Sequence, residues 1–275
     1  MTTEESTDEV VLYREQDGVG WITLNRPDKL NALNREVFGE LALALDRLEA
    51  SDAAVVGVLH GSGRAFAAGA DIEDYVGITV HDYRAFMDVG RAVSDRLAAL
   101  AKPVIASVQG FALGGGFELV LACDLVVAAD NARFGLPEPK LGLVPGGGGT
   151  QRLPRLVGRV RANELLLTGR FLTADEALAW GLVNRVVPKD ELPEATAELA
   201  AAVVAQAPLA VETIKRIVRE GLEASLPTAL TLEQDATARL IVTEDALEGI
   251  AAFIEKRAPQ FRGVAGARGP GSEGS

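Results

Sequence analysis

Two glutamates in glycine- and proline-rich surroundings are the residues best suited to acid–base chemistry. Glu118 stands in the otherwise apolar run FELVLAC, one turn into a short helix expected to open at Gly114–Gly116. Glu138 stands between two prolines in LPEPK, and because proline fixes the backbone, its side chain sits on a stiff loop. Glu118 either caps its helix or points into a site, and Glu138 is either a solvated turn residue or part of that site.

The glycines before Glu118 could expose backbone N–H groups to a ligand. They follow an apolar strand and open a helix, where the first N–H groups have no partner within the helix. The helix dipole makes this end positive, which favours a carbonyl oxygen that gains negative charge. The loop AFAAGAD offers a second set of donors near Ala70, unless it is a plain strand-to-helix connection.

Several other kinds of chemistry lack their residues. The P-loop pattern GxxxxGK[ST] is absent, the dinucleotide pattern GxGxxG does not occur around Gly114–Gly116 or Gly146–Gly149, and the GxSxG of serine hydrolases is absent. His60 ends an apolar strand and is expected to be packed, and Cys123 is expected in a helix core. One cysteine and two histidines exclude an intrachain disulfide and a cysteine-rich zinc site. We therefore expect neither a metal nor a cofactor.

Composition narrows the class of protein further. The chain has 275 residues, of which 48% are hydrophobic and 24% charged, as in a typical globular protein. Its net charge of -12 argues against a nucleic-acid or anionic-membrane binder. No run of ~20 apolar residues predicts a membrane span. The acidic start MTTEESTDE resembles no secretory or mitochondrial leader, so we expect a cytoplasmic protein.

Hydrophobic patterning in the first half predicts alternating strands and helices. Strands without polar alternation, separated by helices, indicate a buried sheet and an α/β chain. Val37, Phe38, Leu41, Leu45 and Leu48 form one helical stripe, and Phe86, Val89, Val93, Leu97 and Leu100 form another. The predicted elements are a hairpin over 10–25 turning at Asp17–Gly18, helices over 34–50 and 80–100, strands over 54–60, 103–109 and 125–130, and a glycine-rich turn and helix over 110–124.

The second half is predicted to be mostly helical after a glycine- and proline-rich stretch over 131–150. Thr173 and Glu176 fit a capping box, and Gly181 suits the end of that helix. Thr243 is expected to cap a later helix. The remaining predicted elements are a strand over 182–187, helices over 190–206, 208–224 and 228–257, and a loose glycine-rich tail.

Four motifs taken in order resemble the enoyl-CoA hydratase/isomerase (crotonase) family. They are NRPDKLNAL (25–33), AFAAGADI (65–72), GFALGGGFEL (110–119) and FGLPEPKLGLVPGGGGTQRL (134–153). The combination of AGAD, GGGxE and FGxPE at these spacings is highly specific. The resemblance covers roughly residues 10–262, including FIEKRAPQF (253–261).

The resemblance implies a role for each matching residue. Ala70 and Gly115 match the backbone donors of the oxyanion hole, and Gly146 matches the position that holds the catalytic water. Glu118 and Glu138 match the two glutamates of hydratases, whereas isomerases of the family commonly keep only the second. We assign water activation to Glu118 and proton transfer at C2 to Glu138. The residues expected to contact substrate or its CoA portion are Lys29, Leu30, Arg64, Ala68, Asp71, Ile72 and Lys256.

One departure concerns CoA binding. Many relatives carry a lysine after AGADI, and this chain has Glu73, which puts one contact to CoA in doubt. CoA itself is part of the substrate. Lys256 matches a position on the last helix that can serve a neighbouring subunit.

The resemblance also implies a fold and an assembly. The expected fold is a crotonase-like spiral of ββα units with a helical C-terminal trimerisation region, which gives a homotrimer or a hexamer. The domains expected are a spiral core (1–200), a helical oligomerisation region (201–260) and a flexible tail (261–275). The expected activity is that of an enoyl-CoA hydratase, a lyase of fatty acid metabolism and β-oxidation. A sister acyl-CoA enzyme, namely an isomerase, a carnitinyl-CoA-type dehydratase or a hydrolase, stays the alternative.

Overall fold

The structure, a computed structural model, describes residues 9–263. Its larger sheet has the strand order β1-β2-β3-β4-β6-β9, in which β1 is antiparallel to β2 and the other neighbours are parallel. The smaller sheet has the order β5-β7-β8, with β5 parallel to β7 and β8 antiparallel to it. The strands are β1 (Val11–Gln16), β2 (Val19–Leu24), β3 (Val56–Gly61), β4 (Val104–Val108), β5 (Phe111–Leu113), β6 (Leu125–Ala129), β7 (Arg133–Gly135), β8 (Phe171–Thr173) and β9 (Arg185–Val187).

Helices account for most of the remaining described chain. Four short 3-10 helices are η1 (Pro27–Lys29), η2 (Ile72–Tyr75), η3 (Glu138–Leu141) and η4 (Lys189–Glu191). The α-helices are α1 (Arg35–Ala50), α2 (Val80–Ala99), α3 (Gly115–Val120), α4 (Gly149–Val157), α5 (Arg159–Thr168), α6 (Ala174–Ala179), α7 (Leu192–Val204), α8 (Pro208–Leu222), α9 (Leu226–Leu240) and α10 (Glu244–Glu255). The α/β class predicted from the sequence is confirmed.

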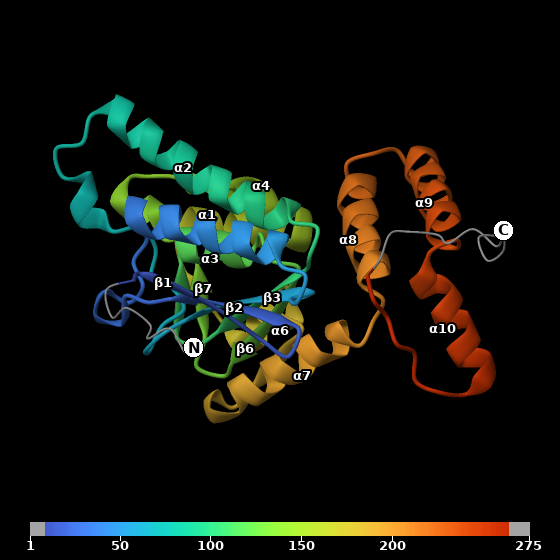
Figure 1. Cartoon of the computed structure of the whole chain (residues 1–275). Helices are drawn as coiled ribbons and strands as arrows, with labels where there is room; N and C mark the ends of the chain where they lie inside the picture. The colour runs from blue at the N-terminus through green and yellow to red at the C-terminus, as the bar shows by residue number, and fades with distance from the viewer. Residues whose placement is uncertain (1–8, 264–275) are drawn as a thin grey trace.

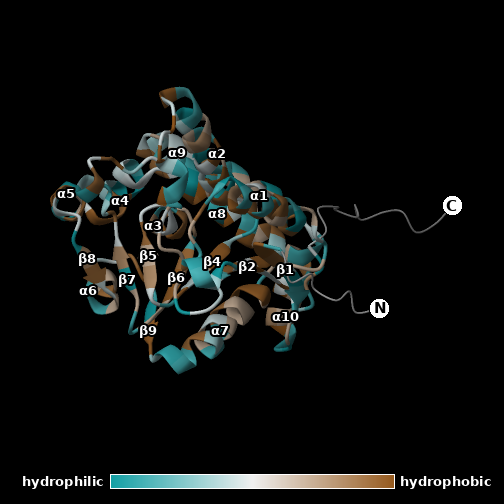
Figure 2. Cartoon of the chain, turned by 90° about the vertical axis from the view of Figure 1, so that its left-hand side faces the viewer, coloured by the Kyte–Doolittle hydropathy of each residue, from teal (hydrophilic) through white to brown (hydrophobic). Residues whose placement is uncertain are grey.

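The larger sheet is covered on both faces, which explains its continuous apolar strands. β4 is buried along its whole length, and β3 is buried at all positions but His60. Figures 1 and 2 place α1 and α2 on one side of the sheet and α7 on the other. Val56, Val58, Ile105 and Val127 pack toward α7, in a cluster separate from the main core under α1 and α2.

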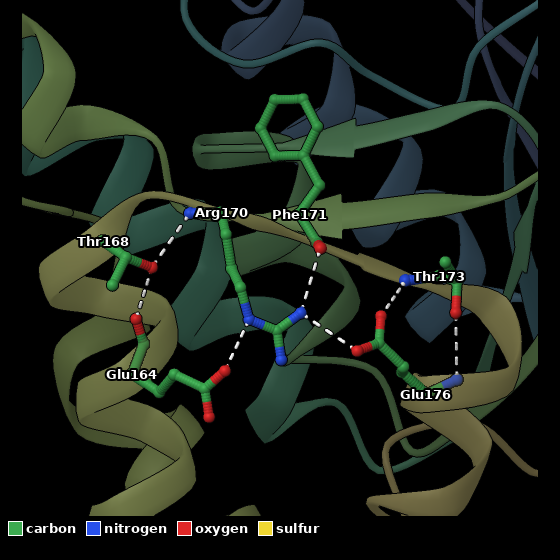
Figure 3. Close-up of polar contacts among 6 residues, drawn as sticks. All are labelled: Glu164, Thr168, Arg170, Phe171, Thr173 and Glu176. Atoms are coloured by element: carbon green, nitrogen blue, oxygen red, sulfur yellow. Dashed lines mark hydrogen bonds and ion pairs between the residues drawn. The ribbon is translucent and has the colours of Figure 1, made fainter.

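Local sequence signals explain where several elements begin and end. The Asp17–Gly18 turn has positive φ at both residues, 52° and 79°, as a tight hairpin requires. The capping box is confirmed, because Thr173 Oγ1 accepts from Glu176 N and the Glu176 carboxylate accepts from Thr173 N (Figure 3). Arg170 bridges Glu164 of α5 and Glu176 of α6 in the same view. Gly181 (φ 77°) follows α6, as predicted.

Several expectations need correction. The stretch over 131–150 holds β7 and η3 as well as loops, and β5 and β8 were not predicted, because three-residue strands carry too little pattern. The stretch over 228–257 is two helices, α9 and α10, with Thr243 capping the second as expected. Val89 is 37% exposed, whereas the other four members of its predicted stripe are buried.

The last three helices extend away from the sheets (Figure 1). α8 buries none of its residues fully, and α9 and α10 expose several large apolar side chains. The predicted tail over 261–275 falls mainly on residues 264–275, which lie outside the described residues, as do residues 1–8. Within residues 9–263 no single helix is long and apolar enough to span a membrane; one pair, Lys189–Val204 and Pro208–Leu222, passes that test together but is bent by 101°.

Candidate active site

A cavity of about 100 Å³ brings together the residues that the sequence singled out for chemistry. Ala70, Gly115, Glu118, Glu138 and Gly146 all line it. They come from four separate segments: the loop after β3, the start of α3, η3 and the glycine-rich turn before α4. Ala68 and Ile72 line it as well.

Ala70 directs its N–H away from the segment that holds it. Leu33 N donates to Gly69 O (2.8 Å) and Asp71 N donates to Leu33 O (2.9 Å), so both neighbours of Ala70 are paired with Leu33. Successive N–H groups of extended backbone point in opposite directions, so the Ala70 N–H faces the other side. Among residues 9–263 no protein group accepts from it.

Gly115 supplies a second N–H at the start of α3. As the first helical residue it has no partner within the helix, and no other acceptor occurs for it in the described chain. The preceding Gly114 has φ 51° and ψ -126°, a conformation that requires glycine. A Cβ on Gly116 would lie 2.3 Å from Ala67 O, so close packing of α3 on that loop also requires glycine.

Glu118 points into the cavity from a buried position. Its side chain is 3% exposed, and Oε1 accepts from Gly149 N at 2.8 Å. Burial raises the pKa of Glu118 above the ordinary glutamate value. The N–H groups of Gly149 and Gly147 and the charge of Arg152 oppose this rise in pKa. Glu118 therefore accepts backbone hydrogen bonds from the 147–149 turn rather than capping its own helix.

Glu138, on η3, lies against the start of α3. A Cβ on Gly114 would be only 3.1 Å from Glu138 Oε1, so the carboxyl group sits beside the Gly115 donor. Pro137 and Pro139 flank it, and η3 ends at Gly142, whose φ is 73°. Glu138 Oε2 is buried with no hydrogen-bond partner among the described residues.

The protonation of Glu138 differs from that of an exposed glutamate. Burial, together with the negative charge of Glu118, raises the pKa of Glu138 to about 7. Near neutral pH the group is therefore partly protonated. A carboxyl group that is partly protonated near pH 7, beside a second carboxyl group that accepts backbone N–H bonds, can serve as the proton donor of an acid–base pair.

The wall facing the two glutamates comes from η2 and α2. Tyr75 and Tyr83 meet edge to face, with ring centroids 5.2 Å apart, and Tyr75 contacts Phe86 in the same way. Met87 packs on Gly146 so closely that a Cβ there would lie 2.0 Å from the Met87 methyl group. The sequence analysis missed Tyr75, Tyr83 and Met87 as site residues. Their only signal was the position of α2 in the chain, not a motif.

Five predicted substrate contacts lie outside the cavity lining. Lys29 Nζ pairs with Glu73 at 3.1 Å on the surface, and Asp71 pairs with the partly buried Arg26 at 3.1 Å. Arg64 is exposed, Lys256 is the residue that ends α10, and Leu30 lies at the end of η1. The roles of these five residues stay predictions.

Other candidates for chemistry take no part in the cavity. His60 exchanges a 2.8 Å hydrogen bond with Thr23, and burial lowers its pKa to about 4. Cys123, expected in a helix core, instead lies in the loop after the end of α3, partly buried, and burial raises the pKa of its thiol. Residues 9–263 contain no group of three or more His, Cys, Asp or Glu side chains able to hold a metal ion.

Comparison with known proteins agrees with this geometry. The family model described as enoyl-CoA hydratase/isomerase matches residues 14–264. A probable enoyl-CoA hydratase of Mycobacterium bovis is 45% identical over 255 residues, covering 93% of this chain and 98% of the relative. A short-chain-enoyl-CoA hydratase of Clostridium acetobutylicum is 43% identical over 248 residues, covering 90% of this chain and 95% of the relative.

Solved structures show the same fold. The crystal structure of an enoyl-CoA hydratase from Bacillus anthracis matches with a TM-score of 0.90 and 40% identity, over 93% of this chain and all of that one. The crystal structure of an enoyl-CoA hydratase from Geobacillus kaustophilus matches with a TM-score of 0.89 and 44% identity, over 94% of this chain and all of that one. The crotonase-like fold expected from the sequence is confirmed, and the chain belongs to the enoyl-CoA hydratase/isomerase family.

Proposed function

We propose that this chain is an enoyl-CoA hydratase, which adds water reversibly across the α,β-double bond of an enoyl-CoA thioester. The observation that carries the proposal is the meeting of two carboxyl groups and two unpaired backbone N–H groups in one cavity. The printed names of the relatives, among them a crotonyl-CoA hydratase of Syntrophomonas wolfei at 40% identity, support the same reaction.

The backbone donors polarise the thioester. The conjugated double bond is too electron-rich for attack by water unless its carbonyl oxygen takes up negative charge. The N–H groups of Ala70 and Gly115 bind that oxygen and stabilise the enolate-like transition state, each by ~3 kcal/mol. The start of α3 adds the positive end of a helix dipole at the Gly115 donor.

The two glutamates divide the proton transfers. Glu118, ionised and oriented by the Gly149 N–H, takes a proton from water as the oxygen attacks C3. Glu138, whose pKa of about 7 leaves it partly neutral, gives a proton to C2. The reverse reaction, dehydration, exchanges these roles. The backbone of Gly146 borders the same space and is proposed to hold the attacking water.

The apolar side chains that α9 and α10 leave exposed support assembly into a homotrimer or hexamer. Ile241 and Val242, between these helices, and Leu247, Ile250, Phe253 and Ile254 of α10 are each 47% exposed or more. Apolar surface of this kind marks a protein–protein interface. Lys256, at the end of α10, is proposed to reach the CoA of a neighbouring subunit. Cytoplasmic location and the lack of need for any cofactor remain predictions.

The test is a panel of short, medium and long enoyl-CoA thioesters, followed by loss of absorbance of the conjugated double bond. Hydratase activity predicts loss of this absorbance and formation of a 3-hydroxyacyl-CoA. The alternative is a sister acyl-CoA enzyme. Movement of the double bond without uptake of water would identify an isomerase, and release of free CoA thiol would identify a hydrolase.

A further inference from the structure

Arg152 of α4 connects the turn that holds Glu118 to the helix that forms the cavity wall. Its Nη1 donates to Gly147 O at 2.7 Å, and its Nη2 pairs with Asp95 of α2 at 2.6 Å. The guanidinium group therefore uses two of its donors at once, one on each element. The Arg152 side chain is 21% exposed, so its charge is only partly screened by solvent.

The turn that Arg152 binds is the one that touches Glu118. Gly149 N donates to Glu118 Oε1, and Cβ atoms on Gly147 and Gly149 would lie 2.7 Å and 3.1 Å from its carboxylate oxygens. Gly148 has φ 115°, and a Cβ there would lie 2.1 Å from Arg152 Nη1. The side chain of Arg152 thus folds directly over the turn, and the positive φ of Gly148 favours glycine beneath it.

We propose that Arg152 is a positioning residue: it holds the 147–149 turn against Glu118 and keeps that carboxylate ionised, so that it can activate water. The proposal rests on the proposed role of Glu118 as base. Two contributions combine in it. The hydrogen bond to Gly147 O fixes where the N–H groups point, and the positive charge favours the ionised form of the nearby carboxylate.

Other charged and titratable groups face Glu118 from the surrounding elements. Glu138 of η3 and the phenols of Tyr75 and Tyr83 each interact with its charge, and none of them favours its ionisation. Arg152 is the cation whose charge lowers the pKa of Glu118 against the effect of burial. Removing this charge should therefore raise the pKa of Glu118.

The test compares two variants. Arg152→Gln keeps a polar side chain but removes the positive charge, and Arg152→Lys keeps the positive charge but has a single donor group. At low pH kcat/KM rises with pH as Glu118 ionises, and this rising part of the profile is the acid limb. In Arg152→Gln the acid limb of kcat/KM should move up by ~0.5–1 pH unit, and the maximal rate should fall roughly tenfold or more as the turn loosens. Arg152→Lys should return the acid limb to within ~0.3 pH unit of the parent and recover part of the rate.

The matched control is Arg155→Gln, one turn further along α4. Arg155 donates to Gln151 O and reaches Glu223 at 3.5 Å, and it does not touch the turn. The Arg155→Gln variant should therefore have the same acid limb and the same maximal rate as the parent. Circular dichroism and particle mass of every variant are compared with the parent, and Arg152→Lys keeps the test decisive if Arg152→Gln does not fold.

A double-mutant cycle separates this proposal from a general structural role. Once Glu118→Gln has removed the carboxylate, adding Arg152→Gln should cost little more, because both changes act through the same group. An unmoved acid limb in a folded Arg152→Gln enzyme, or full additivity with Glu118→Gln, would overturn the proposal. If Glu118→Gln alone keeps the parent rate, the proposed function of Glu118 fails first.

Discussion

At the scale of single residues, the two carboxyl groups of the cavity have different surroundings. Glu118 accepts a backbone hydrogen bond from the glycine turn, whereas Glu138 Oε2 has no partner among the described residues. No hydrogen bond to Oε2 therefore stabilises a negative charge on Glu138, and the negative charge of Glu118 makes ionisation of Glu138 still less favourable. The chemistry benefits from a neutral acid, but the folded state must tolerate an unfavourable charge whenever Glu138 ionises.

Glu138→Gln should accordingly stabilise the protein, and only at higher pH. The pKa of Glu138 is raised from an ordinary 4.5 to about 7, so folding favours its protonated form. Between these values the unfolded chain has released the proton and the folded chain still holds it. The parent's free energy of unfolding therefore falls as pH rises through this window. The Glu138→Gln variant cannot ionise at this position, so its free energy of unfolding does not fall for this reason.

Urea unfolding at a series of pH values checks this prediction. The stability difference between Glu138→Gln and parent should be near zero below the ordinary glutamate pKa and should grow in favour of the variant until about pH 7. Glu194→Gln, at an exposed glutamate of α7 outside the cavity lining, is a control expected to give no such increase. A difference that stays constant with pH would contradict the raised pKa.

A second residue-scale prediction concerns Glu73, which stands where many relatives carry a lysine. Glu73 pairs with Lys29, and both side chains are more than half exposed. If Lys29 contacts an anionic part of CoA, as the family resemblance implies, Glu73 competes for the same ammonium group. Glu73→Gln should then lower KM for crotonyl-CoA by roughly two- to fivefold with little change in kcat, because an exposed ion pair contributes at most about 1 kcal/mol.

The control for this prediction is Asp74→Gln, the next acidic residue on η2, which makes no ion pair with Lys29. It removes the same charge from the same short helix. An equal fall in KM for both variants would mean that general charge, rather than release of Lys29, controls CoA binding. An unchanged KM in Glu73→Gln would argue against Lys29 as a CoA contact.

At the scale of elements, α2 lines part of the cavity and contacts the glycine-rich turn before α4. Phe86, Met87, Gly90 and Ser94 all face the cavity from this helix. Met87 contacts Gly146, and Asp95 holds Arg152. α2 therefore limits the space of the cavity beside Gly146 and also supports the turn that serves Glu118.

Met87→Ala should change which acyl chains the enzyme accepts. Shortening this side chain opens space beside Gly146, so longer enoyl-CoA thioesters should gain relative to crotonyl-CoA. The ratio of their kcat/KM values should rise roughly tenfold, since each methylene accommodated by a pocket changes selectivity by about 10–200-fold. Val89→Ala, on the solvent side of the same helix, is the control and should leave the ratio unchanged. Equal ratios in both variants would mean that Met87 does not limit the chain.

Elements with long, regular patterns could be predicted from the sequence, whereas three of the four three-residue strands in the described chain could not. The stripe of Val37, Phe38, Leu41, Leu45 and Leu48 correctly predicted α1, because one face of a long helix repeats its signal several times. β5, β7 and β8 have three residues each and are defined by their partners in the smaller sheet. In α2 the residues that line the cavity include Gly90 and Ser94, whereas Val89 of the predicted stripe is 37% exposed.

The site divides in the same way. Glu118, Glu138, Ala70 and Gly115 could be found because they lie in motifs that resemble those of the family. Tyr75, Tyr83 and Met87 belong to the cavity because of how α2 and η2 pack, which no local pattern encodes. The contact of Arg152 with the glycine turn depends on a side chain folding back over five residues, and the sequence offers only the adjacent GGGGTQR.

At the scale of the whole molecule, the last three helices form an arm, of which α8 is tied to the core by the ion pair of Lys215 with Asp124 at 2.7 Å. α8–α10 extend from the side of the sheets (Figure 1) and expose apolar residues such as Leu222, Leu226, Phe253 and Ile254, each at least 70% exposed. Exposed apolar surface of this extent is unfavourable in a monomer. The arm is therefore the expected contact between copies of this chain.

Light scattering should give three or six times the chain mass of 28.9 kDa at micromolar concentration. Phe253→Asp places a charge in the proposed contact and should shift the particles toward single chains, because a buried unpaired charge is costly. Val160→Asp, at an apolar side chain of α5 that is 77% exposed, is the matched control and should keep the parent mass. A parent mass of one chain would contradict the proposed assembly.

The hydration rate of crotonyl-CoA, measured for the parent, Glu118→Gln and Glu138→Gln, tests the two-glutamate account most directly. Each substitution keeps size and shape and removes one ionisable group, and general acid–base catalysis contributes ~10²–10⁴-fold. Each variant should therefore lose about that factor in kcat while still binding crotonyl-CoA. Parent-like hydration by both variants would contradict the account.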